Sequence, residues 1–256
     1  MYFLLTKLIF LSVACFIAAF VDSIAGGGGM ISLPSYLIVG VSPHLSLGTN
    51  KFASTAGACT SAVKFYKSGF VNSKLLKYLL PFTFVGSVLG VKTVLLLNQD
   101  FLYPLVLILI LAIGIYTLFS KEIGNEDGFE GLNKKNLCLG IIFAFSLGFY
   151  DGFFGPGTGS LLVFGLIKIY KFDFLHATAN TKCLNFTSNI AALATFALSS
   201  SIDYKIGIMA AIVMIFGAYL GTKIAINKGS KIIRPLFIII SLAVAIKMIY
   251  SLITTH

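Results

Sequence analysis

The stretch VDSIAGGGGM, residues 21–30, places one carboxylate and four consecutive glycines inside a long apolar segment. Glycine costs about 1 kcal/mol relative to alanine in a helix interior, and burying an unpaired charge costs more. The residues on both sides are apolar, so a surface turn does not account for this stretch. The pattern instead indicates a helix that breaks inside an apolar environment.

The composition indicates which environment that is. Of the 256 residues, 57% are hydrophobic and 11% are charged, and the mean hydropathy is +0.96. A soluble domain carries about 25% charged residues. Four apolar runs are each long enough to cross a hydrocarbon layer of about 30 Å as a helix, at 75–97, 101–119, 206–226 and 232–252. The sequence therefore predicts an all-α, polytopic membrane protein, whose formal charge of +10 reflects lysine-rich cytoplasmic loops rather than nucleic-acid binding.

The second half of the chain repeats the first. Asp22 and Gly26 recur 129 positions later as Asp151 and Gly155, and Lys51 recurs 131 positions later as Lys182. The hydrophilic segment 121–135 separates the two copies. We therefore expect a first transmembrane repeat at 1–120, a linker at 121–135 and a second repeat at 136–256. Both repeats also carry a GxxxG pattern, which lets helices approach closely, at Gly86/Gly90 and Gly217/Gly221.

Each repeat has the same expected plan. An apolar segment leads into the glycine motif, and a segment too short for an ordinary span leaves it, at 30–39 and 160–169. Three longer helices follow, at about 46–66, 74–97 and 101–120, and at about 176–198, 204–226 and 232–253. The glycine-rich pair is either two thin crossings or a re-entrant hairpin, and the parity of the repeat is odd in both cases. The second repeat should then insert upside down relative to the first, which is the inverted-repeat plan of many secondary transporters.

The basic residues orient this plan. With the N-terminus outside, the lysine clusters at 64–77 and 223–234 both lie on the cytoplasmic side, as the positive-inside rule requires. We therefore expect a multi-pass protein of the lipid bilayer with both termini outside.

The glycine motifs have a chemical use in such a plan. A glycine-rich break exposes backbone N–H groups, and a short helix that begins there points the positive end of its dipole at the break. Irregular backbone at membrane depth is stable only inside protein or against a water-filled cavity. Two breaks that enter from opposite leaflets would meet near the midplane. We interpret them as a backbone cradle for an anion, and the alternative is tight helix packing at a kink.

Polar side chains accompany both motifs. Lys182, Asn185 and Asn189 fall on one helix face at i, i+3 and i+7, and Lys51 begins a smaller polar face in the first half. Ionisable residues inside a membrane are candidate functional residues, although a lysine near a helix end can also snorkel to a headgroup. The candidate substrate-binding residues are Gly26, Gly27, Gly28, Gly29, Asn50, Lys51, Gly155, Gly157, Thr158, Asn180, Lys182, Asn185 and Asn189.

Asp22 and Asp151 are the carboxylates inside the predicted apolar segments. They could be proton carriers that couple anion movement to a gradient, since a low dielectric favours the protonated carboxyl. They could equally be structural, either by accepting hydrogen bonds from glycine N–H groups or by pairing with the lysines. A third hypothesis is an intramembrane aspartyl protease with the two aspartates as its dyad.

The motifs resemble one known family. VDSIAGGGGMISLP with GTNK at 48–51, repeated as YDGFFGPGTGS with ANTKCLNFTSN at 179–189, is similar to the sulfite exporter TauE/SafE family. One departure is that the asparagine of GTNK stands one position later than that of ANTK. The resemblance implies a bacterial or archaeal inner-membrane transporter, not an enzyme, for a small sulfur-containing anion such as sulfite, a sulfonate or thiosulfate, without cofactor or metal. The alternative function is a proton-coupled carrier of a small carboxylate.

Overall fold

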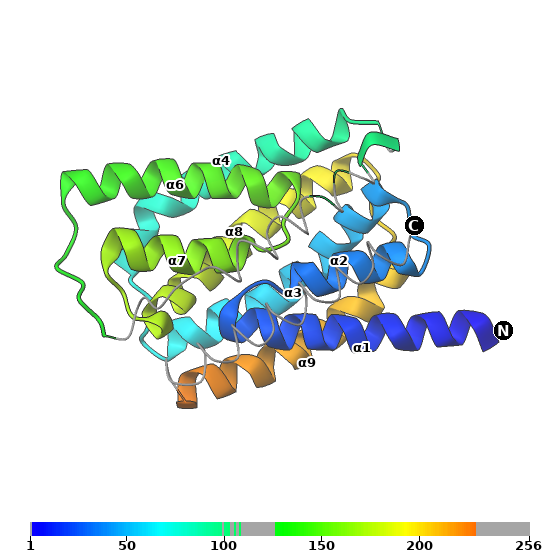
Figure 1. The fold of residues 1–256 in the computed structure, drawn as a ribbon, viewed down its shortest axis with the longest axis horizontal. Helices are drawn as coiled ribbons and strands as arrows, with labels where there is room; N and C mark the ends of the chain where they lie inside the picture. The colour runs from blue at the N-terminus through cyan, green and yellow to red at the C-terminus, as the bar shows by residue number, and fades with distance from the viewer. Residues whose placement is uncertain (1, 99, 103–104, 106–107, 109–125, 229–256) are drawn as a thin grey trace.

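The computed structural model describes residues 2–98, 100–102, 105, 108 and 126–228 (Figure 1). The expected helix at 232–253 and most of the one at 101–120 lie outside these residues. The described helices are α1 (Tyr2–Ala25), α2 (Gly29–Ile38), α3 (Pro43–Lys67), α4 (Ser73–Leu95), α6 (Lys134–Phe153), α7 (Thr158–Tyr170), α8 (Phe174–Leu198) and α9 (Tyr204–Lys228). These bounds confirm the expected short helix after each glycine motif and the two longer helices that follow it.

Each glycine motif turns the chain back toward the end of the molecule from which it came. Lys7 near the start of α1 donates a hydrogen bond to the carbonyl oxygen of Val39 just after α2, at 3.0 Å. In the second hairpin, the hydroxyl of Tyr170 at the end of α7 donates to the carbonyl oxygen of Asn136 near the start of α6, at 3.1 Å. The α1–α2 and α6–α7 hairpins therefore open toward opposite ends of the molecule (Figure 1).

The outer helices pack in two pairs, α4 with α6 and α1 with α9. Glycines bring the backbones of each pair together. A Cβ atom on Gly86 or Gly90 of α4 would overlap backbone of α6 at Phe145 and Phe149, and a Cβ on Gly217 or Gly221 of α9 would overlap backbone of α1 at Phe16 and Phe20. The close approach predicted from the two GxxxG patterns is confirmed.

The four outer helices carry the apolar surface. The segments Leu5–Ile24, Ser73–Leu95, Lys134–Phe153 and Tyr204–Lys228 are long and apolar enough to cross a membrane. Large hydrophobic residues are exposed on them at helical spacing, such as Leu5, Ile9, Val13 and Ile17 on α1 and Ile208, Ile212, Phe216 and Tyr219 on α9. In water these stripes would cost free energy in proportion to their area, whereas lipid covers them without such a cost. The structure is that of a multi-pass membrane protein.

The two polar helices, α3 and α8, lie in the middle of this arrangement (Figure 1). They pack against each other, and α9 covers α3 while α4 covers α8. Their buried faces carry lysine, asparagine, serine and threonine side chains in addition to small apolar ones. The fold thus places the polar residues of both halves on two adjacent central helices.

The described part of the linker, residues 126–133, docks on the turn between α7 and α8. The Gly128 N–H donates to the Lys171 carbonyl oxygen at 2.9 Å, and the ring of Phe129 stacks on Phe172 with centroids 4.8 Å apart. Nearby, His176 Nδ1 lies 2.9 Å from Asp173 Oδ1 and 4.0 Å from Asp127 Oδ2. An ionic cluster therefore ties the linker to the start of α8.

This cluster predicts a pH dependence of stability. The hydrogen bond with Asp173 raises the pKa of His176 against the effect of burial, and the charges of Asp173 and Asp127 add to this. Burial alone would raise the pKa of Asp173, but the hydrogen bonds from His176 outweigh it and hold that pKa below its ordinary value. The stabilisation by His176 is complete below its ordinary pKa of about 6.5 and is lost as the pH rises through the raised value, while that by Asp173 is lost only as the pH falls below about 4.

We therefore expect the melting temperature of the detergent-solubilised protein to fall more between pH 6 and pH 8.5 in the wild type than in the His176→Gln variant. The pair is partly exposed, so the difference should be about 1 to 3 °C. Equal falls in the two proteins would show that the cluster does not stabilise the fold.

Candidate functional site

The two glycine breaks meet in the centre of the molecule. Gly26 lies directly against the start of α7, where a Cβ atom would come 2.5 Å from the carbonyl carbon of Gly159 and the nitrogen of Ser160. Gly29 lies against Pro156 in the same way, with 3.0 Å from a Cβ to the Pro156 Cα. Gly26 also has φ +79°, which side-chain-bearing residues rarely adopt. Two backbones can approach this closely only without side chains, which accounts for the glycines at the contact.

Two buried ion pairs flank this contact, and each joins the two halves of the chain. Lys51 Nζ on α3 lies 2.9 Å from Asp151 Oδ1 on α6, and Lys182 Nζ on α8 lies 2.7 Å from Asp22 Oδ2 on α1. The lysine side chains are only 4% and 0% exposed. Both lysines therefore turn inward to a carboxylate of the other half, and the snorkelling alternative is wrong.

The carboxylates accept further hydrogen bonds. Asp151 accepts one from the hydroxyl of Ser188, and Asp22 accepts one from the backbone N–H of Gly28 at 3.3 Å. Both structural contacts considered for the aspartates, lysine pairing and glycine N–H bonding, are thus present. Because each aspartate faces a lysine rather than the other aspartate, the arrangement is not that of a protease dyad.

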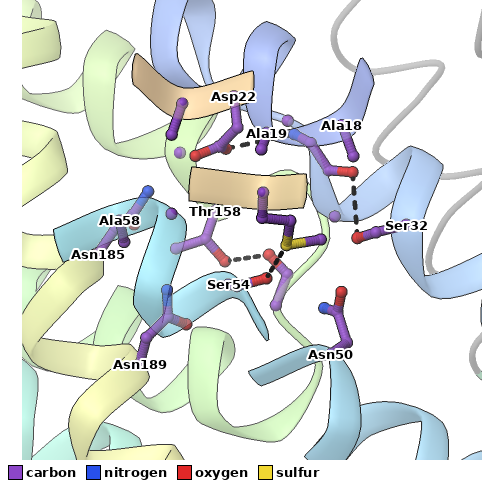
Figure 2. A pocket seen from close by; sticks show the side chains of 18 of the residues that line it. Ala18, Ala19, Asp22, Ser32, Asn50, Ser54, Ala58, Thr158, Asn185 and Asn189 are labelled. Atoms are coloured by element: carbon purple, nitrogen blue, oxygen red, sulfur yellow. Dashed lines mark hydrogen bonds between the residues drawn. The ribbon is translucent and has the colours of Figure 1, made fainter. Parts of the chain in front are cut away.

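A cavity of about 50 Å³ lies between the breaks and the ion pairs (Figure 2). A single water needs roughly 10 to 15 Å³ by this measure, so the cavity has room for about three to five water-sized groups. Asn185 and Asn189 line one side, Asn50 the other, and Asp22 lies above them (Figure 2).

The polar lining of this cavity contains several hydrogen-bond donors besides the carboxylates of Asp22 and Asp151. Lysine has three N–H donors, and Lys51 uses two of them, toward Asp151 and toward Asn189 Oδ1 at 3.0 Å. Because Lys51 only donates, Asn189 must turn its oxygen to the lysine, which leaves its NH₂ group for the cavity. In Asn50 and Asn185 the Oδ1 atoms are buried without a partner among the described residues, so their NH₂ groups supply the accessible polar atoms.

The structure brings most of the predicted site residues together. Those that line the cavity are Gly27, Gly28, Gly29, Asn50, Lys51, Gly155, Gly157, Thr158, Asn185 and Asn189, together with Asp22 and Asp151. Gly26 and Lys182 stand behind this lining, in the backbone contact and in the ion pair with Asp22.

Asn180 lies away from the cavity. Its Oδ1 accepts the Asn72 N–H at 2.9 Å, and its Nδ2 donates to the His176 carbonyl oxygen at 2.8 Å, so it fastens the start of α4 to α8. The reason is the one-residue shift between GTNK and ANTK, which rotates the asparagine by about 100° around the helix. Asn50 consequently points into the cavity and Asn180 does not.

Several lining residues gave no signal in the sequence. The cavity is also lined by Ser32, Gly57, Met214 and Ala218. Because small and apolar residues are common throughout membrane helices, nothing in the sequence marked these four as lining residues. Within the described residues, no group of three His, Cys, Asp or Glu side chains comes together as a metal site.

Broken helices around a central, polar cavity are a feature of many secondary transporters. The comparisons with known proteins agree. Residues 11–248 match the family described as sulfite exporter TauE/SafE, and the chain belongs to this family of membrane transporters. Similar proteins include a probable membrane transporter protein of Haemophilus influenzae, 39% identical over 92% of each chain, and YfcA of Escherichia coli, a probable membrane transporter protein 34% identical over 92% of this chain and 87% of the other. No solved structure matches the chain.

Proposed function

We propose that the protein is a secondary transporter for a small sulfur-containing oxyanion of the sulfite, sulfonate or thiosulfate class, bound in the cavity between the two glycine breaks. The observation that carries the proposal is the set of side-chain donors in that cavity, a lysine and three asparagine amides, with the N-terminal ends of α2 and α7 beside them. The N-terminus of a helix favours an anion through its N–H groups and its dipole. The family description points to the same substrate class.

The net charge of the four ionisable side chains indicates that a transported anion must be accompanied by a positive charge. Lys51 and Lys182 balance Asp151 and Asp22, so the four side chains are neutral together. A monoanion would leave this buried site with an uncompensated negative charge, which is costly in a low dielectric. One proton on a carboxylate restores neutrality. We therefore propose that Asp22 and Asp151 form the proton-coupling element of the transporter.

The same proposal includes two inverted repeats, at 1–120 and 136–256, on either side of the linker 121–135. Three features support it. The glycine hairpins open toward opposite ends of the molecule, the α4–α6 contact matches the α9–α1 contact glycine for glycine, and each lysine pairs with the aspartate of the other half. Rocking of one repeat against the other would expose the central site to each side in turn.

The proposal also includes an orientation in the inner membrane, which the placement of the lysines supports. The end that carries the α3–α4 and α7–α8 turns holds Lys64, Lys67, Lys74, Lys77, Lys168, Lys171 and Lys228, whereas Lys7, Lys92 and Lys205 are near the opposite end. The basic end should face the cytoplasm. The N-terminus, at the other end, would then lie outside.

Thiol labelling checks this orientation. In a variant without the four native cysteines, single cysteines replacing Lys67 and Lys228 should resist a membrane-impermeant reagent added to intact cells, because both lie at the basic end. A cysteine replacing Ser199, in the turn before α9, should react. The reverse pattern would place the basic end outside and contradict the orientation.

Uptake into proteoliposomes tests the function. Sulfite, thiosulfate, methanesulfonate and acetate are supplied with and without an inward proton gradient. We expect uptake of at least one sulfur oxyanion, faster with the gradient, and little uptake of acetate. Uptake of acetate alone would favour the carboxylate carrier, an alternative to which the family and the relatives lend no support, and peptide cleavage without flux would favour the protease.

A further inference from the structure

We infer that Asp22, and not Asp151, is the carboxylate that takes up the proton accompanying the anion. This inference rests on the proposed transport function and goes beyond it, because the two aspartates occupy equivalent positions in the repeats. The two aspartates differ in one neighbouring position, which is Ser188 beside Asp151 and Gly57 at the equivalent place in the other repeat.

Both carboxylate oxygens of Asp151 have a donor beside them. One oxygen pairs with Lys51 and the other accepts the hydroxyl of Ser188, while the side chain is only 6% exposed. The backbone of Ser188 is held in turn, since its carbonyl oxygen accepts the Ser87 hydroxyl at 2.7 Å. Hydrogen bonds from charged and neutral donors favour an ionised carboxylate over the protonated one. Protonation of Asp151 would weaken both contacts.

Asp22 lacks the equivalent of the serine. Position 57 stands six residues after Lys51, as position 188 stands six residues after Lys182, and it is a glycine. Asp22 therefore has Lys182 and the longer Gly28 N–H contact of 3.3 Å, and its side chain is 29% exposed. It also lines the cavity, as does Gly57. Both carboxylates line the cavity, but Asp22 is the more exposed of the two, and its contacts include no hydroxyl donor like that of Ser188 among the described residues.

The charges around Asp22 allow it to bind and release a proton during transport. They are Lys182 on α8 and, across the cavity, Lys51 on α3 and Asp151 on α6, whereas α2, α7 and α9 contribute only uncharged residues to the cavity. A proton from the aqueous side binds a carboxylate oxygen of Asp22, and the four side chains then carry one net positive charge. The bound monoanion cancels that charge, and both leave together when the site opens to the other side.

The decisive variant places a serine at position 57, where the first repeat has glycine. A Cβ atom on Gly57 would lie 3.4 Å from the Met214 carbonyl oxygen and 3.5 Å from its Cβ, which are ordinary contacts, so Gly57→Ser fits. From the correspondence with Ser188 in the other repeat, we expect the added hydroxyl to donate to Asp22 as Ser188 donates to Asp151. We expect the pH at which proton-driven sulfite uptake is half-maximal to fall by about one unit, a tenfold change in proton concentration.

Two controls separate the hydroxyl from other effects. Gly57→Ala adds the same Cβ without a donor and should leave the midpoint pH in place, and Ser188→Ala removes the donor from Asp151 and should also leave it in place. A shift with Ser188→Ala but not with Gly57→Ser would assign the proton to Asp151 and overturn the inference. Wild-type sulfite uptake that does not respond to pH would also overturn the inference, but it would still support the proposed function. If the protein takes up no anion at all, the proposed function itself is rejected.

Discussion

Replacement of Lys51 by glutamine should weaken sulfite binding by about 10- to 100-fold. Lys51 supplies the full positive charge in the cavity lining, whereas asparagine amides and helix termini supply only partial charges. Glutamine keeps a donor of similar length but removes the charge, and a hydrogen bond to a charged group contributes about 1.5 to 3 kcal/mol. Calorimetry of the purified protein with sulfite measures the change.

The matched control is Lys205→Gln, at the start of α9 and far from the cavity, which should bind sulfite like the wild type. Lys51→Arg keeps the charge and should bind better than the glutamine variant, although the larger guanidinium fits less well. If Lys51→Gln binds as tightly as the wild type, the anion does not bind beside Lys51.

Alanine at Gly26 should destabilise the protein by about 4 kcal/mol or more, or prevent folding, because the added Cβ would collide with the backbone of the other glycine break. Gly69 supplies the control. Its φ of +81° is nearly that of Gly26, but a Cβ there would meet nothing within 4 Å. Gly69→Ala should therefore show only the cost of the left-handed backbone, about 1 to 2 kcal/mol.

Melting temperatures of the two purified variants measure this difference. The φ angle is nearly the same at the two positions, so the excess loss in Gly26→Ala reports the contact between the breaks. Similar melting temperatures would mean that the breaks do not touch in the folded protein.

The helices and the glycine breaks could be predicted from the sequence because their signals are local. Apolar runs of spanning length mark the outer helices, and four glycines in an apolar segment have few uses besides a close backbone approach. The repeat of Asp22 and Lys51 as Asp151 and Lys182 also identified the charged residues of the site.

The pairing of these residues could not be predicted, because it depends on how the helices cross. Sequence alone left the aspartates as proton carriers or as partners of the lysines, and it gave no reason for each lysine to reach the other half. Asn180 shows the same limit: the motif resembles that of Asn50, but one step along a helix moves the side chain to another face, where it bonds to Asn72 instead of lining the cavity. The difference between Ser188 and Gly57 becomes informative only once Asp151 is seen to accept the serine hydroxyl.

The central claim is that a small oxyanion binds between the two glycine breaks. Selenite has the shape and charge of sulfite and scatters anomalously at the selenium edge, so crystals of the wild-type protein grown with selenite test the claim directly. The account predicts one strong anomalous peak in the cavity, within hydrogen-bond distance of Lys51 Nζ and of the amide nitrogens of Asn50 and Asn185. A peak elsewhere in the protein, with none in this cavity, would contradict it.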